Sequence, residues 1–185
     1  MMTRTGTVPT SRMILIACGN AKRISRVMED ILSSCSYNVK TDDFEGNTDF
    51  VIYVCADGSH IPDGLIPEVV VFDEANRIEE NCLESFKYKI TSYECYSRYY
   101  HEEMTEKSTS FITYSPDNYS ADITCRNLCN SDNMAMFDVI ANGILSRVHI
   151  SRDDYTVEDV LLCTAALTAE GMPLDSVLGY FNSDP

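Results

Sequence analysis

The segment from Gly19 to Arg23 combines residue types that suit an anion-binding loop. It follows a short apolar run, 13–18, and precedes a stretch with helical spacing, so it is expected to join a strand to a helix. Amides at a helix start carry partial positive charge, and Lys22 and Arg23 add two cationic side chains. We therefore predict a site for a phosphate-containing anion formed by Gly19, Asn20, Ala21, Lys22 and Arg23. The alternative left open is a plain turn whose charged side chains point into solvent.

The same segment matches a nucleotide-binding phosphate loop only in part. Such a loop also joins a strand to a helix, with a lysine on the phosphates and a Ser or Thr hydroxyl on magnesium. Lys22 is present, but Gly19 is the only glycine and Arg23 stands where the hydroxyl is needed. An anion could bind here without magnesium, because the cationic side chains supply positive charge. ATP or another phosphate-containing anion is thus the expected ligand, with magnesium doubtful.

Other residue types that often carry chemistry form no recognisable set. His60, His101 and His149 are scattered and no nucleophile motif accompanies them. Cys125 and Cys129 are separated by three residues, without the second pair that a zinc site needs. We predict neither a catalytic residue nor a metal site. The eight cysteines contain no CxxC pair, and we expect reduced thiols in a cytoplasmic protein.

Composition and charge limit the classes of function that remain. The chain has 185 residues and a net charge of −15, which excludes non-specific binding to nucleic acid. Residues 1–40 nevertheless carry net +4, and the remainder −19. No apolar run approaches the roughly 18 residues of a membrane-spanning helix, so no membrane association is expected. We expect a flexible N-terminal tail over residues 1–12 and one domain over residues 13–185.

The first part of the chain alternates between continuous apolar runs and helical spacing. We predict strands near 13–18, 37–41, 49–55, 68–72 and 110–114, and a helix over 21–34. Apolar residues at 78, 82, 86, 90 and 93 predict one long helix that continues toward residue 100. Continuous apolar strands mixed with helices indicate a mainly parallel sheet covered on both faces.

The second part has the character of an antiparallel sheet followed by helices. Short strands are expected at 121–126, 136–141 and 144–150, and Asn142-Gly143 predicts a hairpin between the last two. Thr156 and Asp159 form the pattern of a capping box for a helix that ends near Glu170. A last helix is expected to begin at Pro173. The predicted fold class is α/β: a P-loop-like, mainly parallel sheet flanked by helices, with a smaller antiparallel part.

The order of these segments is similar to that of a known family. The stretch 16–23 (IACGNAKR) resembles the loop ITGTNGKT of the Mur ligases, and 67–74 (PEVVVFDE) resembles their PDVAVFTN strand. Similar matches occur at Phe86-Lys87-Tyr88-Lys89, at 112–115 (ITYS), at 121–128 (ADITCRNL), and in the two last helices. Over about 13–182, the chain thus resembles the central ATP-binding domain of these ATP-dependent amide ligases, whose relatives are the folylpolyglutamate synthases. The resemblance implies a P-loop-like fold and an ATP site at residues 19–23.

Departures from the family pattern fall where the family performs its chemistry. Arg23 replaces the magnesium-binding Thr, and Tyr53 stands at the position of an acidic magnesium ligand. The stretch Glu74 to Asn81 lacks the family's His, and Tyr155-Thr156 replaces its His-Asn pair. Lys89 or Lys87 would match the lysine that many members carbamylate. We expect no counterpart of the family's flanking substrate domains within these 185 residues.

Three hypotheses follow from these observations. The first is a degenerate Mur-ligase-like domain that is non-catalytic alone and acts as a binding or regulatory partner of another protein. The second is an ATP-dependent amide ligase component, of peptidoglycan-precursor or polyglutamate type, that needs domains from another chain. The third is an unrelated α/β module. The lost ligands favour the first over the second, and the order of segments favours both over the third.

Overall fold

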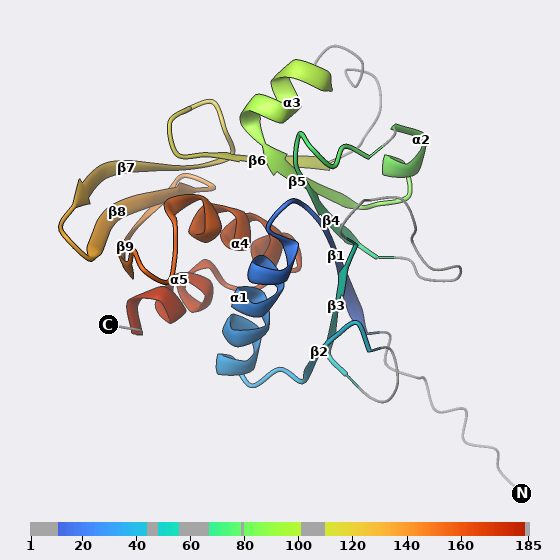
Figure 1. Ribbon diagram of the computed structural model, residues 1–185, viewed down its shortest axis with the longest axis horizontal. Helices are drawn as coiled ribbons and strands as arrows, with labels where there is room; N and C mark the ends of the chain where they lie inside the picture. The colour runs from blue at the N-terminus through green and yellow to red at the C-terminus, as the bar shows by residue number, and fades with distance from the viewer. Residues whose placement is uncertain (1–10, 44–47, 56–66, 79, 101–109, 184–185) are drawn as a thin grey trace, which may run out of the picture.

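The computed structural model describes residues 11–43, 48–55, 67–78, 80–100 and 110–183. Its centre is one nine-stranded sheet in the order β2-β3-β1-β4-β5-β6-β7-β8-β9 (Figure 1). The strands from β2 to β7 run parallel, whereas β7, β8 and β9 form an antiparallel meander. The predicted fold class, including the switch from parallel to antiparallel pairing, is confirmed.

The described strands are β1 (Arg12–Ala17), β2 (Val39–Thr41), β3 (Phe50–Val54), β4 (Val69–Phe72), β5 (Tyr88–Ser92), β6 (Ser110–Ser115), β7 (Ile123–Asn130), β8 (Met134–Ala141) and β9 (Ile144–Ser151). The described helices are α1 (Ala21–Ser34), α2 (Glu80–Leu83), α3 (Tyr93–Tyr99), α4 (Val157–Ala169) and α5 (Leu174–Ser183).

Strand β1 occupies the position that decides where a ligand could bind. It lies between β3 and β4, and the chain fills the sheet outward from it on both sides. Open α/β sheets bind ligands outside the carboxyl ends of their strands, at the point where the strand order reverses. The loop that follows β1 is at that point. Within the predicted N-terminal tail, residues 1–10 lie outside the described residues, and β1 begins at Arg12.

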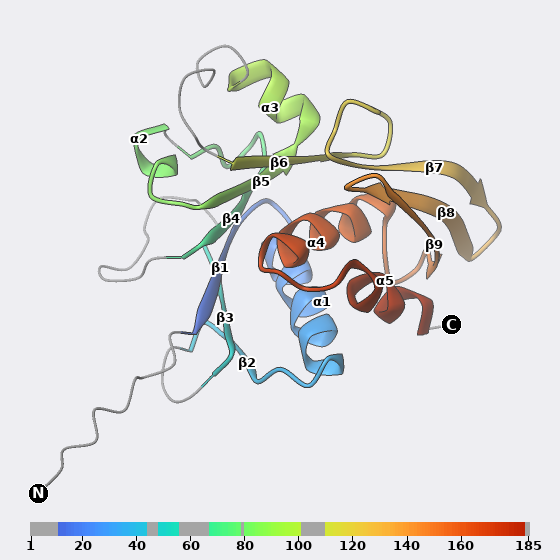
Figure 2. The same ribbon diagram turned by 180° about the vertical axis from the view of Figure 1, so that it is seen from behind.

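The two faces of the sheet are covered by different helices. Helices α1, α4 and α5 cover one face, and α2 and α3 lie on the other, as the two opposite views show (Figures 1 and 2). Alternation along β1 explains this arrangement, because Ile14 and Ile16 face the first layer while Leu15 and Ala17 face the second. A central parallel strand is buried on both faces, which accounts for its continuous apolar run.

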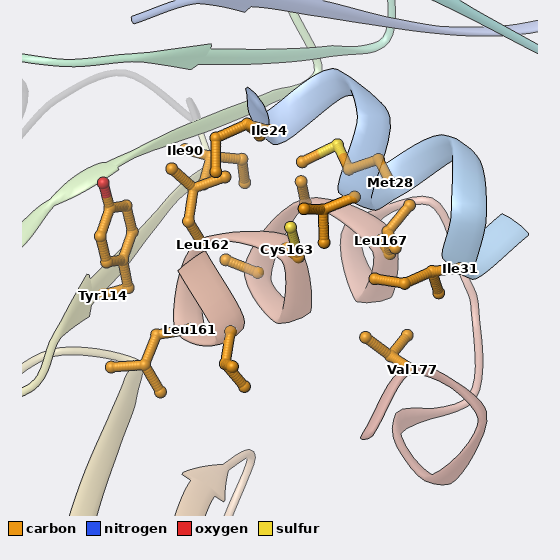
Figure 3. Close-up of a cluster of buried hydrophobic side chains, with 14 of the residues drawn as sticks. Ile24, Met28, Ile31, Ile90, Tyr114, Leu161, Leu162, Cys163, Leu167 and Val177 are labelled. Carbon is orange, nitrogen blue, oxygen red and sulfur yellow. The ribbon is translucent and has the colours of Figure 1, made fainter. Parts of the chain in front are cut away.

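The larger core lies between α1, α4 and the sheet. Ile24, Met28 and Ile31 from α1 meet Cys163 and Leu167 from the almost wholly apolar α4 (Figure 3). Helix α4 is apolar around most of its circumference because it is enclosed by α1, α5 and the sheet. Burial on most sides thus accounts for its apolar sequence.

The antiparallel part confirms the hairpin predicted at Asn142-Gly143. Both residues have positive φ, 51° and 76°, as a two-residue turn of type I′ requires. Strands β8 and β9 pair through the turn without interruption, from Ala141 opposite Ile144 to Met134 opposite Ser151. The inward side chains of this meander, such as Phe137 and Val148, complete the core beneath α4 and α5.

The long helix expected from residue 78 toward residue 100 is wrong. The structure instead has α2, the strand β5 and the short helix α3 in this interval. Residues 88–92 (YKITS) pair in parallel with both β4 and β6, and Ile90 and Thr91 are buried on opposite faces. The apolar spacing of three and four fits a helix equally well, but the gap between β4 and β6 requires a strand. Pairing with β4 and β6 therefore determined that residues 88–92 form a strand and not a helix.

The N-terminus of α4 contains the predicted capping box, which gives a stability prediction. The Thr156 side chain accepts a hydrogen bond from the Asp159 amide, and the Asp159 carboxylate accepts one from the Thr156 amide at 2.7 Å. Thr156→Ala should lower the free energy of unfolding by about 1 kcal/mol, as measured by urea denaturation. Thr156→Ser keeps the hydroxyl and should lose much less. Equal losses in the two variants would contradict the capping role.

Candidate functional site: the loop between β1 and α1

The predicted loop residues lie together around the start of α1. Cys18, Gly19, Asn20, Ala21, Lys22 and Arg23, with Val54 at the end of β3, line a pocket of about 320 Å³. Asn20 is the N-cap of α1, and its side chain makes no capping hydrogen bond. Helix α1 has 14 residues and no acidic residue in its first turn. Its N-terminal dipole is therefore not offset by an acidic residue of its own first turn.

The amide groups of the loop are already partly used by the protein. The Ala21 amide donates to the Cys18 carbonyl at 3.0 Å, and the Arg23 amide donates to the Asn20 carbonyl at 2.9 Å. The Gly19 amide donates to the carboxylate of Asp73 at 2.6 Å. Three of the five amides of residues 19–23 thus have acceptors within the chain, which reduces the number available to an anion.

Asp73 is the residue at this site that the sequence analysis missed. It follows β4 directly, and β4 is the neighbour of β1, so both carboxyl ends reach the same edge. Its other carboxylate oxygen accepts hydrogen bonds from the backbone and side-chain amides of Asn76 at 2.8 and 3.0 Å. A carboxylate directly after a buried strand was the available signal, but only the pairing of β1 with β4 places it against Gly19.

The Cys18 thiol lies at the carboxyl end of β1, where burial and nearby charge affect its pKa. Its thiol is buried and donates to the side-chain oxygen of Asn20 at 3.1 Å. Burial first, and then the negative charge of Asp73, raise the pKa of Cys18 to about 11. Cys18 is therefore a neutral thiol at physiological pH, and it is a poor nucleophile.

The two cationic side chains of the loop have different environments. Arg23 forms an ion pair with the buried carboxylate of Asp159, which also accepts from the Thr156 amide in the capping box of α4. Lys22 is exposed, and its side chain forms no ion pair within the described part of the chain. The alternative in which both cations merely point into solvent thus fails for Arg23, which instead connects the starts of α1 and α4. Lys22 is the cation that remains for an anionic ligand.

The structure also places the remaining residues that the family resemblance singled out. Tyr53 is within β3, opposite Leu15 of β1. Glu74 accepts hydrogen bonds from Tyr99 and Arg98 on α3, and these contacts, the Tyr99 bond first, lower its pKa. His149 is on β9, whereas His60 and His101 lie outside the described residues. Among the described residues, no three His, Cys, Asp or Glu side chains are grouped as metal ligands.

The two candidate lysines differ sharply in burial. Lys87 is exposed and pairs with Glu68, whereas Lys89 is only 1% exposed and donates to the Phe86 carbonyl at 2.5 Å. Burial lowers the pKa of Lys89, and the charge of Glu84 opposes this effect. Lys89 is in β5 and Lys87 directly precedes it, so neither is in the long helix that the apolar spacing predicted.

These features define an α/β domain with a loop and a helix after its first strand, at the switch point of a mainly parallel sheet. Solved structures with this fold include a UDP-N-acetylmuramoyl-L-alanyl-D-glutamate–2,6-diaminopimelate ligase, at a TM-score of 0.72 and 14% identity over 96% of this chain. The MurF ligase of Thermotoga maritima in complex with ADP matches at 0.65 and 9% over 94%. The folylpolyglutamate synthetase of Lactobacillus casei matches at 0.62 and 7% over 94%. The fold is Mur-ligase-like, as the resemblance implied.

The match covers only part of each neighbour. The chain spans 47% of the diaminopimelate ligase, 48% of the MurF ligase and 62% of the folylpolyglutamate synthetase. No protein-family model and no curated protein matches the sequence. In the described residues, no helix has the length and apolar character needed to cross a membrane.

Proposed function

We propose that this chain is a Mur-ligase-like nucleotide-binding-type domain that does not ligate by itself and acts in the cytoplasm as a binding or regulatory partner of another protein. The observation that carries this proposal is the hydrogen bond from the Gly19 amide to Asp73. A carboxylate there occupies a donor of the anion-binding loop and adds a negative charge beside it. Both effects oppose a polyphosphate.

Arg23 supports the same conclusion. Magnesium takes oxygen ligands in octahedral geometry, and a guanidinium offers only hydrogen-bond donors. Arg23 is in addition paired with Asp159 and cannot move toward a ligand without breaking its ion pair with a buried carboxylate. We expect weak binding of phosphate or a nucleotide that depends on Lys22, is largely independent of magnesium and weakens with salt.

A second candidate function is favoured by the structural neighbours, which are ligases. In that proposal the chain is a component of an ATP-dependent amide ligase and receives its substrate domains from another chain. Magnesium would then be held in a way that differs from the family pattern, since Arg23 and Tyr53 replace its ligands.

Titration of the chain with ATP in the presence and absence of magnesium separates the two candidates. We expect similar, weak affinity under both conditions, a loss of binding in Lys22→Ala, and no phosphate release. Arg26→Ala is a matched control, because Arg26 is an exposed cation on the same helix beyond its first turn. Magnesium-dependent phosphate release above the Lys22→Ala background would overturn the non-catalytic proposal and favour the ligase component.

A further inference from the structure

Strand β9 ends the sheet, and one side chain occupies two of the backbone hydrogen-bonding groups on its outer edge. Its inner edge pairs with β8 along the whole strand. On the outer edge, the His149 amide donates to Asn182 Oδ1 at 2.9 Å, and Asn182 Nδ2 donates to the Arg147 carbonyl at 3.1 Å. The carboxamide of Asn182 thus accepts and donates as the backbone of a neighbouring strand would.

Asn182 is held in this position by the packing of α5. The preceding residue, Phe181, is fully buried and lies in edge contact with Tyr155 and Tyr180. Val177, one turn earlier, is also fully buried. Because α5 packs against β9, the last turn of the helix places the side-chain amide of Asn182 beside the strand, where it bonds to Arg147 and His149.

The two hydrogen bonds are not needed to satisfy buried groups. Both lie in exposed surroundings, so water would satisfy Arg147 and His149 if Asn182 were absent. The side chain therefore has an effect that water lacks: it excludes another strand from this edge. Unpaired strand edges are templates for association with further chains, and folded proteins block them by specific devices.

The opposite edge of the sheet, formed by β2, is protected against pairing with another strand in a different way. Strand β2 has only three residues, which offers little length for pairing. Strand β9 has eight residues and begins with Ile144 and Leu145, whose side chains are 54% and 57% exposed. Of the two edges, β9 is the one that is long and apolar enough to pair with another strand.

We propose that the Asn182 side chain blocks the outer edge of β9 against pairing with another strand. The strand that it excludes is β9 of a second copy of this chain. Two copies related by a two-fold axis present the same edge to each other in antiparallel orientation, which is the geometry of an isologous contact. Ile144 and Leu145 would add apolar contacts at such a seam. This inference is independent of the ligand proposed for the β1–α1 loop.

The test is Asn182→Ala, studied at an ionic strength that screens the net charge of −15. Amide hydrogen exchange at His149 should accelerate by about five- to tenfold at low protein concentration, because one hydrogen bond is lost. The mass measured by light scattering should rise toward a dimer as protein concentration increases, whereas the wild type stays monomeric. Ser183→Ala, which changes the next residue of the same helix end, should behave as wild type.

A double variant identifies the surface that associates. Asn182→Ala combined with His149→Pro removes the donor that a second strand would need, while the position-149 amide is not used by β8. This double variant should return to a monomer with an unchanged circular-dichroism spectrum. The proposal is overturned if Asn182→Ala stays monomeric throughout, or if the double variant associates as strongly as the single one.

Discussion

Replacing Asp73 with asparagine is expected to strengthen the binding of pyrophosphate or ATP by about tenfold. Asparagine keeps one oxygen, which can accept from the Gly19 amide, but its NH2 group replaces the oxygen that accepts from the Asn76 amides. The change removes one negative charge within a few ångströms of the place where an anion would approach. At an intermediate effective dielectric constant this charge is worth roughly 1–2 kcal/mol, which corresponds to about a tenfold change in affinity.

Two further variants give this expectation a sharp control. Asp175→Asn makes the same change in net charge at an exposed position in the first turn of α5, and it should leave binding unchanged. Asp73→Ala also frees the Gly19 amide and should bind at least as tightly as Asp73→Asn. The affinities are to be measured by calorimetry, with Lys22→Ala as background. If Asp73→Asn binds no better than Asp175→Asn, Asp73 does not compete with an anion at this loop.

Replacing Glu170 with glutamine should remove a pH-dependent loss of stability. Glu170 is the C-cap of α4 and is only 7% exposed; within the described residues its Oε1 atom is buried without a hydrogen bond. Burial first, and then the negative charge of Glu68, raise the pKa of Glu170 from 4.5 to about 7, although Arg12 and Lys87 oppose this shift. The Arg12 guanidinium nearby donates to the backbone carbonyl of Glu170 at 2.8 Å and stacks on Phe50.

The sign of the effect follows from the raised pKa. Below pH 4.5 the carboxyl is protonated in both folded and unfolded chains, so its full stabilising contribution is present. As pH rises to about 7 the unfolded chain loses its proton first, and the folded state is progressively destabilised. The difference amounts to about 3 kcal/mol above pH 7. At pH 8 Glu170→Gln should therefore be more stable than the wild type by up to this amount, and near pH 4.5 the two should be equal.

Urea denaturation across this pH range checks the expectation. Glu68→Gln provides a second measurement, because removing its charge should move the midpoint of the stability loss to lower pH. Asp175→Asn should leave the wild-type profile unchanged. A constant difference between Glu170→Gln and the wild type at every pH would show that the carboxyl does not titrate in this interval, and the assignment would be wrong.

Only the local part of the candidate site could be predicted from residue types. The cations and amides of Gly19 to Arg23 are local features, and the sequence placed them correctly at a strand-to-helix junction. Their partners come from segments distant in the chain, namely Asp73 after β4 and Asp159 in α4. Because these contacts depend on which strands are neighbours, no local pattern could have indicated that both carboxylates face the loop.

By itself the sequence determined the elements whose signal is local. The buried strand β1, the helix α1, the Asn142-Gly143 hairpin and the capped α4 all follow from apolar runs, spacing, turn residues and caps, which act within a few residues. The tertiary structure alone decided that residues 88–92 form a strand, since their helical spacing yields to pairing with β4 and β6. It likewise decided that Asp73 meets Gly19, that Glu170 is buried, and that Asn182 closes the β9 edge. Each of these depends on long-range packing, in which burial and strand pairing outweigh the intrinsic preference of any short segment.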